Sequence, residues 1–208
     1  MVVRRGSHLP QQESLSGFEP RSQTDRLFFC LFPPAAVGEA IAVESDGLRA
    51  EHSLTGRSIE TARLHLTLHH LGDHVDARED IVQAASGAAS RIDLAPFEII
   101  LSSASSFAGR EGNHPCVLQG GEARQPVHAL WRELSNQLMA AGLGRYLKRE
   151  FTPHVTLLYD KRVLPAQSID PISWTVRDFS LVRSLLGQSR HQLLGTWPLR
   201  GKGVDASG

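Results

Sequence analysis

The chain has 208 residues, of which 41% are hydrophobic and 21% are charged, the balance of a globular protein that can bury a core of its own. Lys and Arg number 22, as do Asp and Glu, and this net charge of zero argues against broad electrostatic binding to nucleic acid. No apolar run approaches the roughly 20 residues of a membrane helix, and Cys30 and Cys116 form no CxxC pair, which indicates buried free thiols. We therefore expect a monomeric cytoplasmic protein that does not contact membranes.

The hydrophobic pattern divides the chain into a leader, one domain and a tail. Residues 1–24 are polar without a period and predict a disordered leader, and residues 200–208 predict a loose tail. Strands and helices alternate between them. In chain order we expect a strand at 26–32, a helix at 35–49, a strand at 64–69, a helix at 76–90, strands at 97–105 and 116–119, a helix at 125–141, and strands at 151–159, 173–186 and 191–199. This order favours an α+β fold with largely antiparallel sheets, and its recurrence in each half predicts two similar lobes.

Two short segments, one in each half, share the pattern His, apolar, Thr, Leu. They are His65-Leu66-Thr67-Leu68 and His154-Val155-Thr156-Leu157, and they begin 89 residues apart. Residues two apart on a strand point the same way, so each segment presents a His and a Thr on one face while its apolar residues anchor the other. The first strand alternates as far as His69, which we expect on the face of His65 and Thr67. If the two strands face each other across a cleft, two imidazoles and two hydroxyls converge.

This set of side chains suits the cleavage of a phosphodiester. The reaction needs a base to activate the attacking water and an acid to protonate the departing oxygen. Imidazole titrates near neutrality, so one His can be neutral while the other is charged. The hydroxyls of Thr67 and Thr156 can donate to the non-bridging phosphate oxygens. The scheme requires neither a metal nor another cofactor, and we expect none.

Simpler interpretations exist for each of these residues. A single HxT is more often structural than catalytic, and Thr67 and Thr156 are also ordinary β-branched strand residues. The histidines that follow the first motif suggest a metal site, but His65 and His69 would lie roughly 13 Å apart on a strand, too far to share one ion. Phe28 and Phe107 are candidates for stacking on a base, although core packing is the favoured interpretation for Phe28.

The sequence resembles the 2′–5′ RNA ligase, or RNA 2′,3′-cyclic phosphodiesterase, family of the two-histidine phosphoesterase superfamily. Three segments between about residues 25 and 199 carry the resemblance: RLFFCLFPP from Arg26, LHLTL from Leu64 with Leu71-Gly72 after it, and FTPHVTL from Phe151. The resemblance implies a bilobal α+β domain over residues 25–199, with two antiparallel sheets facing a central cleft and helices outside.

It also implies hydrolysis of a 2′,3′-cyclic phosphate at an RNA end to a 2′-phosphate. His65 and His154 would be the acid–base pair and Thr67 and Thr156 would bind the phosphate. Our hypothesis is that His154 activates the water and His65 protonates the leaving 3′-oxygen. The same site run backwards would join RNA ends through a 2′–5′ bond.

One departure leaves the substrate open. Many relatives carry an Arg close after the second Thr-Leu, where this chain has Leu158-Tyr159-Asp160, so a basic phosphate contact must come from elsewhere, with Lys148, Arg149 and Arg110 as candidates. The alternatives are a small cyclic nucleotide, an ADP-ribose cyclic phosphate or a 2′–5′ oligonucleotide as substrate, a non-catalytic RNA-binding module on the same fold, and a metal-dependent hydrolase.

Overall fold

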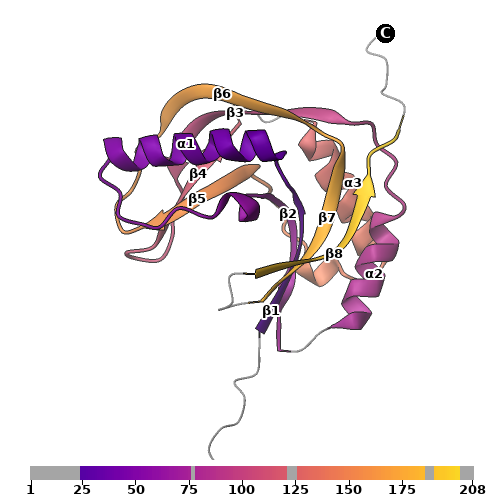
Figure 1. The fold of residues 1–208 in the computed structure, drawn as a ribbon. Helices are drawn as coiled ribbons and strands as arrows, with labels where there is room; N and C mark the ends of the chain where they lie inside the picture. The colour runs from indigo at the N-terminus through magenta and orange to yellow at the C-terminus, as the bar shows by residue number, and fades with distance from the viewer. Residues whose placement is uncertain (1–23, 76–77, 121–125, 186–189, 202–208) are drawn as a thin grey trace, which may run out of the picture.

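A computed structural model describes residues 24–75, 78–120, 126–185 and 190–201. Eight strands and three α-helices are present in this part of the chain (Figure 1). The strands are β1 (Thr24–Leu31), β2 (Leu66–Val75), β3 (Phe97–Ser106), β4 (His114–Gln119), β5 (His154–Asp160), β6 (Gln167–Val176), β7 (Asp178–Leu185) and β8 (Arg190–Pro198). The helices are α1 (Ala35–Glu51), α2 (Glu79–Ala89) and α3 (Val127–Ala140), with 3₁₀ turns at Thr61–Arg63 and Gly144–Tyr146.

The strands form one antiparallel sheet in the order β6-β3-β4-β5-β2-β1-β7-β8. The predicted α+β class with antiparallel pairing is therefore confirmed. The sheet has two four-stranded halves, and the junction between them, β2 with β5, holds the single residue pair Leu66–Val155. The resemblance implied two sheets, whereas the structure joins these two halves into one sheet. The predicted leader and tail lie outside the described residues, apart from Thr24 at the start of β1 and the first residues after Leu199.

The sheet is strongly curved. β6 and β7 lie far apart in the strand order, yet only Arg177 separates them along the chain. The two halves must therefore approach each other where β6 passes into β7, as the ribbon shows (Figure 1). Helix α1 packs against β5 and β6, whereas α2 and α3 pack on each other and on the half that contains β2 and β8. The inner side of the curve is thus left for a cleft.

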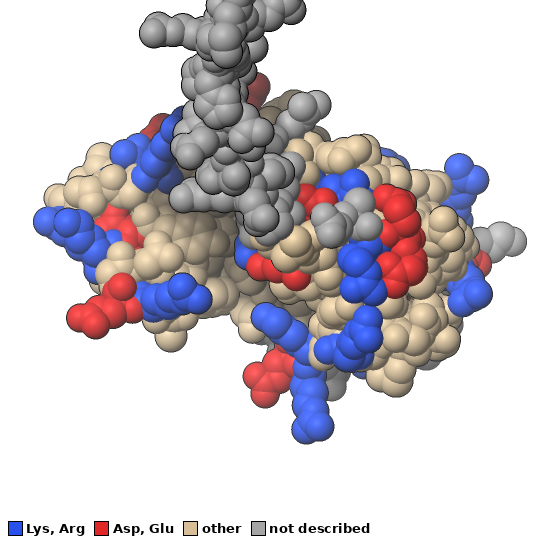
Figure 2. Space-filling view, turned by 90° about the horizontal axis from the view of Figure 1, so that it is seen from below, with Lys and Arg blue, Asp and Glu red and all other residues tan. Residues whose placement is uncertain are grey.

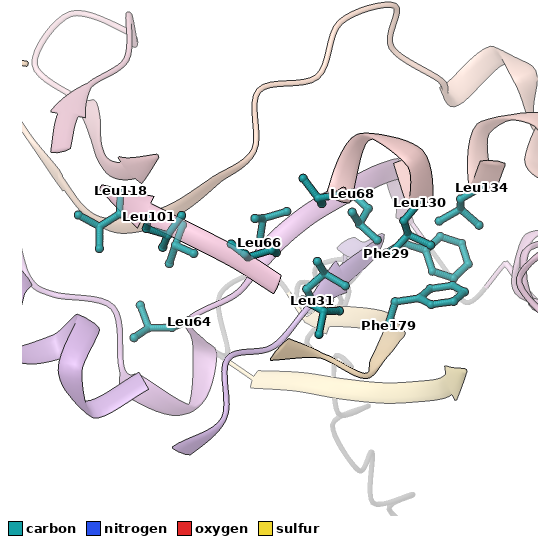
Figure 3. Packing of buried hydrophobic residues seen from close by; sticks show 14 of the residues in the cluster. Phe29, Leu31, Leu64, Leu66, Leu68, Leu101, Leu118, Leu130, Leu134 and Phe179 are labelled. Atoms are coloured by element: carbon teal, nitrogen blue, oxygen red, sulfur yellow. The ribbon is translucent and has the colours of Figure 1, made fainter. Parts of the chain in front are cut away.

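A continuous hydrophobic core crosses the junction between the halves. Leu66 is fully buried at the junction, between Leu101 and Leu118 on one side and Phe29 and Phe179 on the other (Figure 3). The apolar residues of α3 that recur every three or four positions, Val127, Leu130, Leu134 and Leu138, are buried in this core. Gly142, with a φ of +79°, follows the helix in the left-handed conformation that glycine tolerates. The residues that flank Leu66 and Val155 are therefore held by packing on both sides of the junction.

The structure corrects three sequence expectations. The strand predicted at 173–186 is two strands, because β6 pairs with β3 in one half and β7 pairs with β1 in the other. The strand predicted at 64–69 begins at Leu66 and continues to Val75, beyond the expected end at His69. The strand predicted at 116–119 begins two residues earlier, at His114. The connection between the strands predicted at 173–186 and 191–199 falls almost wholly outside the described residues, although β7 and β8 do pair.

His69 does not share the face of His65 and Thr67. In the pairing of β1 with β2, Cys30 lies opposite Thr67 and the next residue, Phe29, lies opposite His69. Leu68 is therefore the extra residue of a β-bulge, which interrupts the alternation. As a result Leu68 and His69 are both buried, and the polar face of the motif ends at Thr67.

Candidate active site

A hollow of about 610 Å³, which we call the cleft, lies between the two halves of the sheet. All four residues that the sequence singles out, His65, Thr67, His154 and Thr156, line it. Figure 2 shows both halves from below, hollowed between them, with acidic and basic side chains interspersed rather than gathered by sign. This mixture agrees with the net charge of zero.

The junction of the sheet places the two motifs side by side. Because Leu66 pairs with Val155 in antiparallel fashion, His65 comes opposite Thr156 and Thr67 comes opposite His154. Leu66 and Val155 are fully buried, and the four residues around them are half-buried on the other face. The site therefore has an approximate local two-fold symmetry, in which each histidine neighbours the threonine of the other motif.

Both imidazole rings are held by the same backbone contact. The Nδ1 of His65 lies 2.7 Å from the carbonyl oxygen of Arg63, and the Nδ1 of His154 lies 2.7 Å from that of Thr152. A carbonyl oxygen only accepts, so Nδ1 must carry the proton in both rings. This fixes the tautomer and leaves Nε2 of each ring to accept a proton when neutral or donate one when charged.

An aromatic ring supports each histidine as well. Phe28 stacks on His65 with ring centroids 4.9 Å apart, and Phe107 meets His154 edge-on at 4.8 Å. Phe28 is only 3% exposed and packs with Cys30 and Val182, as expected for a core residue. These contacts restrict the orientation of both imidazoles before any substrate binds.

Basic side chains surround the histidines, and most were not found from the sequence. Of the three candidates named there, Lys148 lines the cleft, whereas Arg149 and Arg110 do not. Arg63 and Arg26 line it too, but Arg26 is held by Asp73 in a two-bond ion pair at 2.8 and 2.9 Å. The buried Nε of Arg63 has no hydrogen-bond partner among the described residues. Arg63 and Lys148 are therefore the cations best placed for an anion in the cleft.

Two further histidines, His70 and His191, line the cleft, and the sequence analysis missed His191. It lies on β8, and its ring centroid is 5.4 Å from that of His65 and 5.6 Å from that of Phe28. Burial and the neighbouring His65 and Arg63 lower the pKa of His191 to about 4, so it is neutral at pH 7. His191 could not be predicted from the sequence because it lies far along the chain from both motifs. It reaches the site only because β8 pairs with β7 and β7 pairs with β1.

The same physical causes act on the two motif histidines. Burial lowers the pKa of His65, with further lowering from Arg63 and His154, and the hydrogen bond to the Arg63 carbonyl opposes the shift. Burial also lowers the pKa of His154, with a contribution from the Lys148 ammonium. Both rings are therefore neutral in the free protein near pH 7.

The three histidines that follow the first motif each have a separate hydrogen-bond partner. His69 contacts the carbonyl oxygen of Trp131 at 3.0 Å, His70 contacts Asp73 at 3.0 Å, and His74 contacts the carbonyl oxygen of Leu71 at 2.9 Å. Within the described ranges, no group of three His, Cys, Asp or Glu residues is arranged to hold a metal ion.

Comparisons with known proteins identify the family. The sequence profile of the 2′-5′ RNA ligase superfamily matches residues 37–188. Among solved structures, apo Escherichia coli LigT is 30% identical with a TM-score of 0.63, over 86% of this chain and 99% of LigT. LigT complexed with 3′-AMP gives 29% identity and a TM-score of 0.60 over the same shares. The protein TT0787 of Thermus thermophilus, at 24% identity, shares the fold with a TM-score of 0.69 over 85% of this chain and 99% of its own.

No curated protein sequence matches the chain significantly. The fold matches that of E. coli LigT, and together with the profile match it places the chain among the two-histidine phosphoesterases of the LigT type. The chain belongs to the 2′-5′ RNA ligase superfamily. Among the described residues, no helix is both long and apolar enough to cross a membrane.

Proposed function

We propose that this protein hydrolyses a 2′,3′-cyclic phosphate at an RNA end and leaves a 2′-phosphate, with His65 and His154 as its acid–base pair. The observation that carries the proposal is the matched fixation of the two imidazoles, each through Nδ1, beside the hydroxyls of Thr67 and Thr156 in one cleft. Family membership and the solved complex of LigT with 3′-AMP support a nucleotide substrate.

The proposed step is an in-line displacement at phosphorus. Nε2 of neutral His154 takes a proton from water, whose oxygen forms a new bond to phosphorus. The bond from phosphorus to the 3′-oxygen breaks, and Nε2–H of protonated His65 delivers its proton to that oxygen. Thr67 and Thr156 donate to the non-bridging oxygens, where negative charge accumulates, and Arg63 and Lys148 attract the anion. With an RNA 5′-hydroxyl in place of water as the nucleophile, the same displacement of the 3′-oxygen forms a 2′–5′ phosphodiester bond as a side activity.

The product identifies the reaction. A short RNA that ends in a 2′,3′-cyclic phosphate, incubated with the protein in the presence of a chelator, should yield an RNA with a 2′-phosphate and a free 3′-hydroxyl. Nuclease digestion to nucleotides without a phosphatase, followed by chromatography against standards that carry a 2′- or a 3′-phosphate, checks this. A 3′-phosphate product would contradict the proposed geometry, and an unchanged RNA would contradict the function.

The lowered histidine pKa values predict an acidic optimum. In the free enzyme, activity is lost as pH falls through the lowered pKa of the base and also as pH rises through the lowered pKa of the acid. We therefore expect kcat/KM to be maximal below pH 6.5, the ordinary pKa of histidine. The kcat profile should lie at higher pH, because a bound phosphodiester anion stabilises the imidazolium. A kcat/KM profile centred above pH 7 would contradict this scheme.

A further inference from the structure

A second hollow, of about 400 Å³, adjoins the cleft on the side of His154. It shares Thr67, His70, Lys148 and His154 with the cleft, so the two spaces are continuous. Four aromatic side chains line it: Phe107 after β3, Trp131 on α3, Tyr146 in the second 3₁₀ turn, and Phe151 before β5. We call it the aromatic hollow. The proposed chemistry at phosphorus assigns no role to these four rings as a set.

Each of the four rings that line the aromatic hollow contacts another ring: Trp131 and Phe151 contact each other, Phe107 contacts His154, and Tyr146 contacts His74. His69 stacks on Trp131 with centroids 5.4 Å apart and planes 16° apart, and Trp131 stacks on Phe151 at 5.3 Å and 3°. His69 is fixed in turn by the Trp131 carbonyl oxygen at 3.0 Å and by the Ser135 hydroxyl at 3.1 Å. All four lining aromatic residues nevertheless remain half-buried rather than buried. A rigid aromatic wall that is partly open to solvent is a surface on which a planar ring can stack.

A positive charge, that of Lys148, lies where the aromatic hollow adjoins the cleft and can attract a phosphate. Lys148 is exposed, lines both spaces, and lies close enough to His154 to lower the pKa of that ring. The hollow on the opposite side of the cleft, reached past His191, differs in character. It is lined by the exposed Leu193 and by Asp178, with no Lys or Arg among its described lining residues. Glu150 also lines the aromatic hollow, but there Lys148 balances its negative charge, whereas the described lining of the opposite hollow holds Asp178 and no cation. A phosphate backbone leaving the cleft is therefore favoured on the side of Lys148.

We propose that the aromatic hollow binds the base of the nucleotide on the 5′ side of the cyclic-phosphate nucleotide, and that Lys148 contacts the phosphate linking the two. This inference rests on the proposed function and narrows it, since it makes the substrate an RNA strand of at least two nucleotides rather than a cyclic mononucleotide. Because stacking uses the face that every base possesses, the subsite should accept any of the four bases.

The test compares three product-like ligands that carry a terminal 2′-phosphate: a mononucleotide, a dinucleotide, and a dinucleotide whose 5′ residue lacks its base. Calorimetric titration of the unaltered protein should show the dinucleotide binding about 5- to 150-fold more tightly than the abasic dinucleotide, the contribution typical of one stacked base. The Trp131→Ala protein should lose most of this difference, Trp131→Phe should retain part of it, and affinity for the mononucleotide should stay unchanged in both. The abasic ligand needs no variant, so the result does not depend on Trp131→Ala folding correctly.

Hydrolysis of the matching cyclic-phosphate dinucleotide, assayed in parallel, separates this inference from the proposed function. Hydrolysis together with equal affinity for the normal and abasic dinucleotides would overturn the subsite and leave the function standing. A preference for the normal dinucleotide without hydrolysis would overturn the function and support the subsite. Equal affinities with no hydrolysis would overturn both.

Discussion

The His65→Ala and His154→Ala proteins should each hydrolyse a cyclic-phosphate RNA end about 10²- to 10⁴-fold more slowly than the parent, the usual cost of losing a general acid or base. Each ring is held through Nδ1 by a backbone carbonyl, so its Nε2 is the only ring nitrogen left for proton transfer. Single-turnover rates with saturating enzyme measure the effect on chemistry apart from binding.

The matched control for these two variants is His114→Ala. His114 is half-buried at the start of β4 but does not line the cleft. The His114→Ala protein should keep nearly the parental rate, and thermal melting should show that all three variants are folded. If the His65→Ala or His154→Ala protein were folded and as active as His114→Ala, the substituted histidine would not be a catalytic residue. Such a result would favour a non-catalytic binding module.

A substrate with an activated leaving group tells the acid from the base. In a nucleoside 2′-phosphate 4-nitrophenyl ester, nitrophenolate takes the place of the 3′-oxygen and departs without needing a proton. If His65 is the acid, His65→Ala should recover most of the parental rate on this ester, whereas His154→Ala should stay slow because water must still be activated. Recovery by His154→Ala instead would reverse the two roles.

The sequence predicted the parts of the fold that depend on local pattern. The stripe Val127, Leu130, Leu134 and Leu138 predicted α3 to within two residues at each end, because a helix buries residues three and four apart. The sequence analysis missed the division at Arg177. The polar and apolar alternation is interrupted there only by the consecutive polar residues Arg177 and Asp178, and this interruption does not reveal a change of strand partner. Pairing partners are long-range information that period-two patterns do not contain.

The difference between local pattern and long-range pairing also explains which site residues could be predicted from the sequence. His65 and His154 could be found because each carries its threonine two residues away, a local signal that occurs twice. His191 has no such neighbour and reaches His65 only through the pairing of β8 with β7 and of β7 with β1. His69 was assigned to the wrong face because the bulge at Leu68 depends on the register with β1, which the sequence of β2 alone does not reveal.

The two threonines should contribute through their hydroxyl groups rather than their shape. Thr67→Val and Thr156→Val keep the β-branched outline and the strand preference of threonine but remove the donor. Each should lower the rate of the chemical step by about 10²- to 10³-fold, the cost of losing one donor to developing negative charge in an active site. Single-turnover hydrolysis of the cyclic-phosphate RNA end measures this loss.

Serine provides the matched control, since Thr67→Ser and Thr156→Ser keep the hydroxyl and lose only a methyl group. These proteins should stay within about tenfold of the parent, since the donor to the charged oxygens is retained. Because Leu66 pairs with Val155, each threonine lies opposite the histidine of the other motif, and the two losses should be of similar size. If the valine and serine variants at one position were equally active, that threonine would be a strand residue without a phosphate contact, and the positive charges of Arg63 and Lys148 would have to stabilise the anion alone.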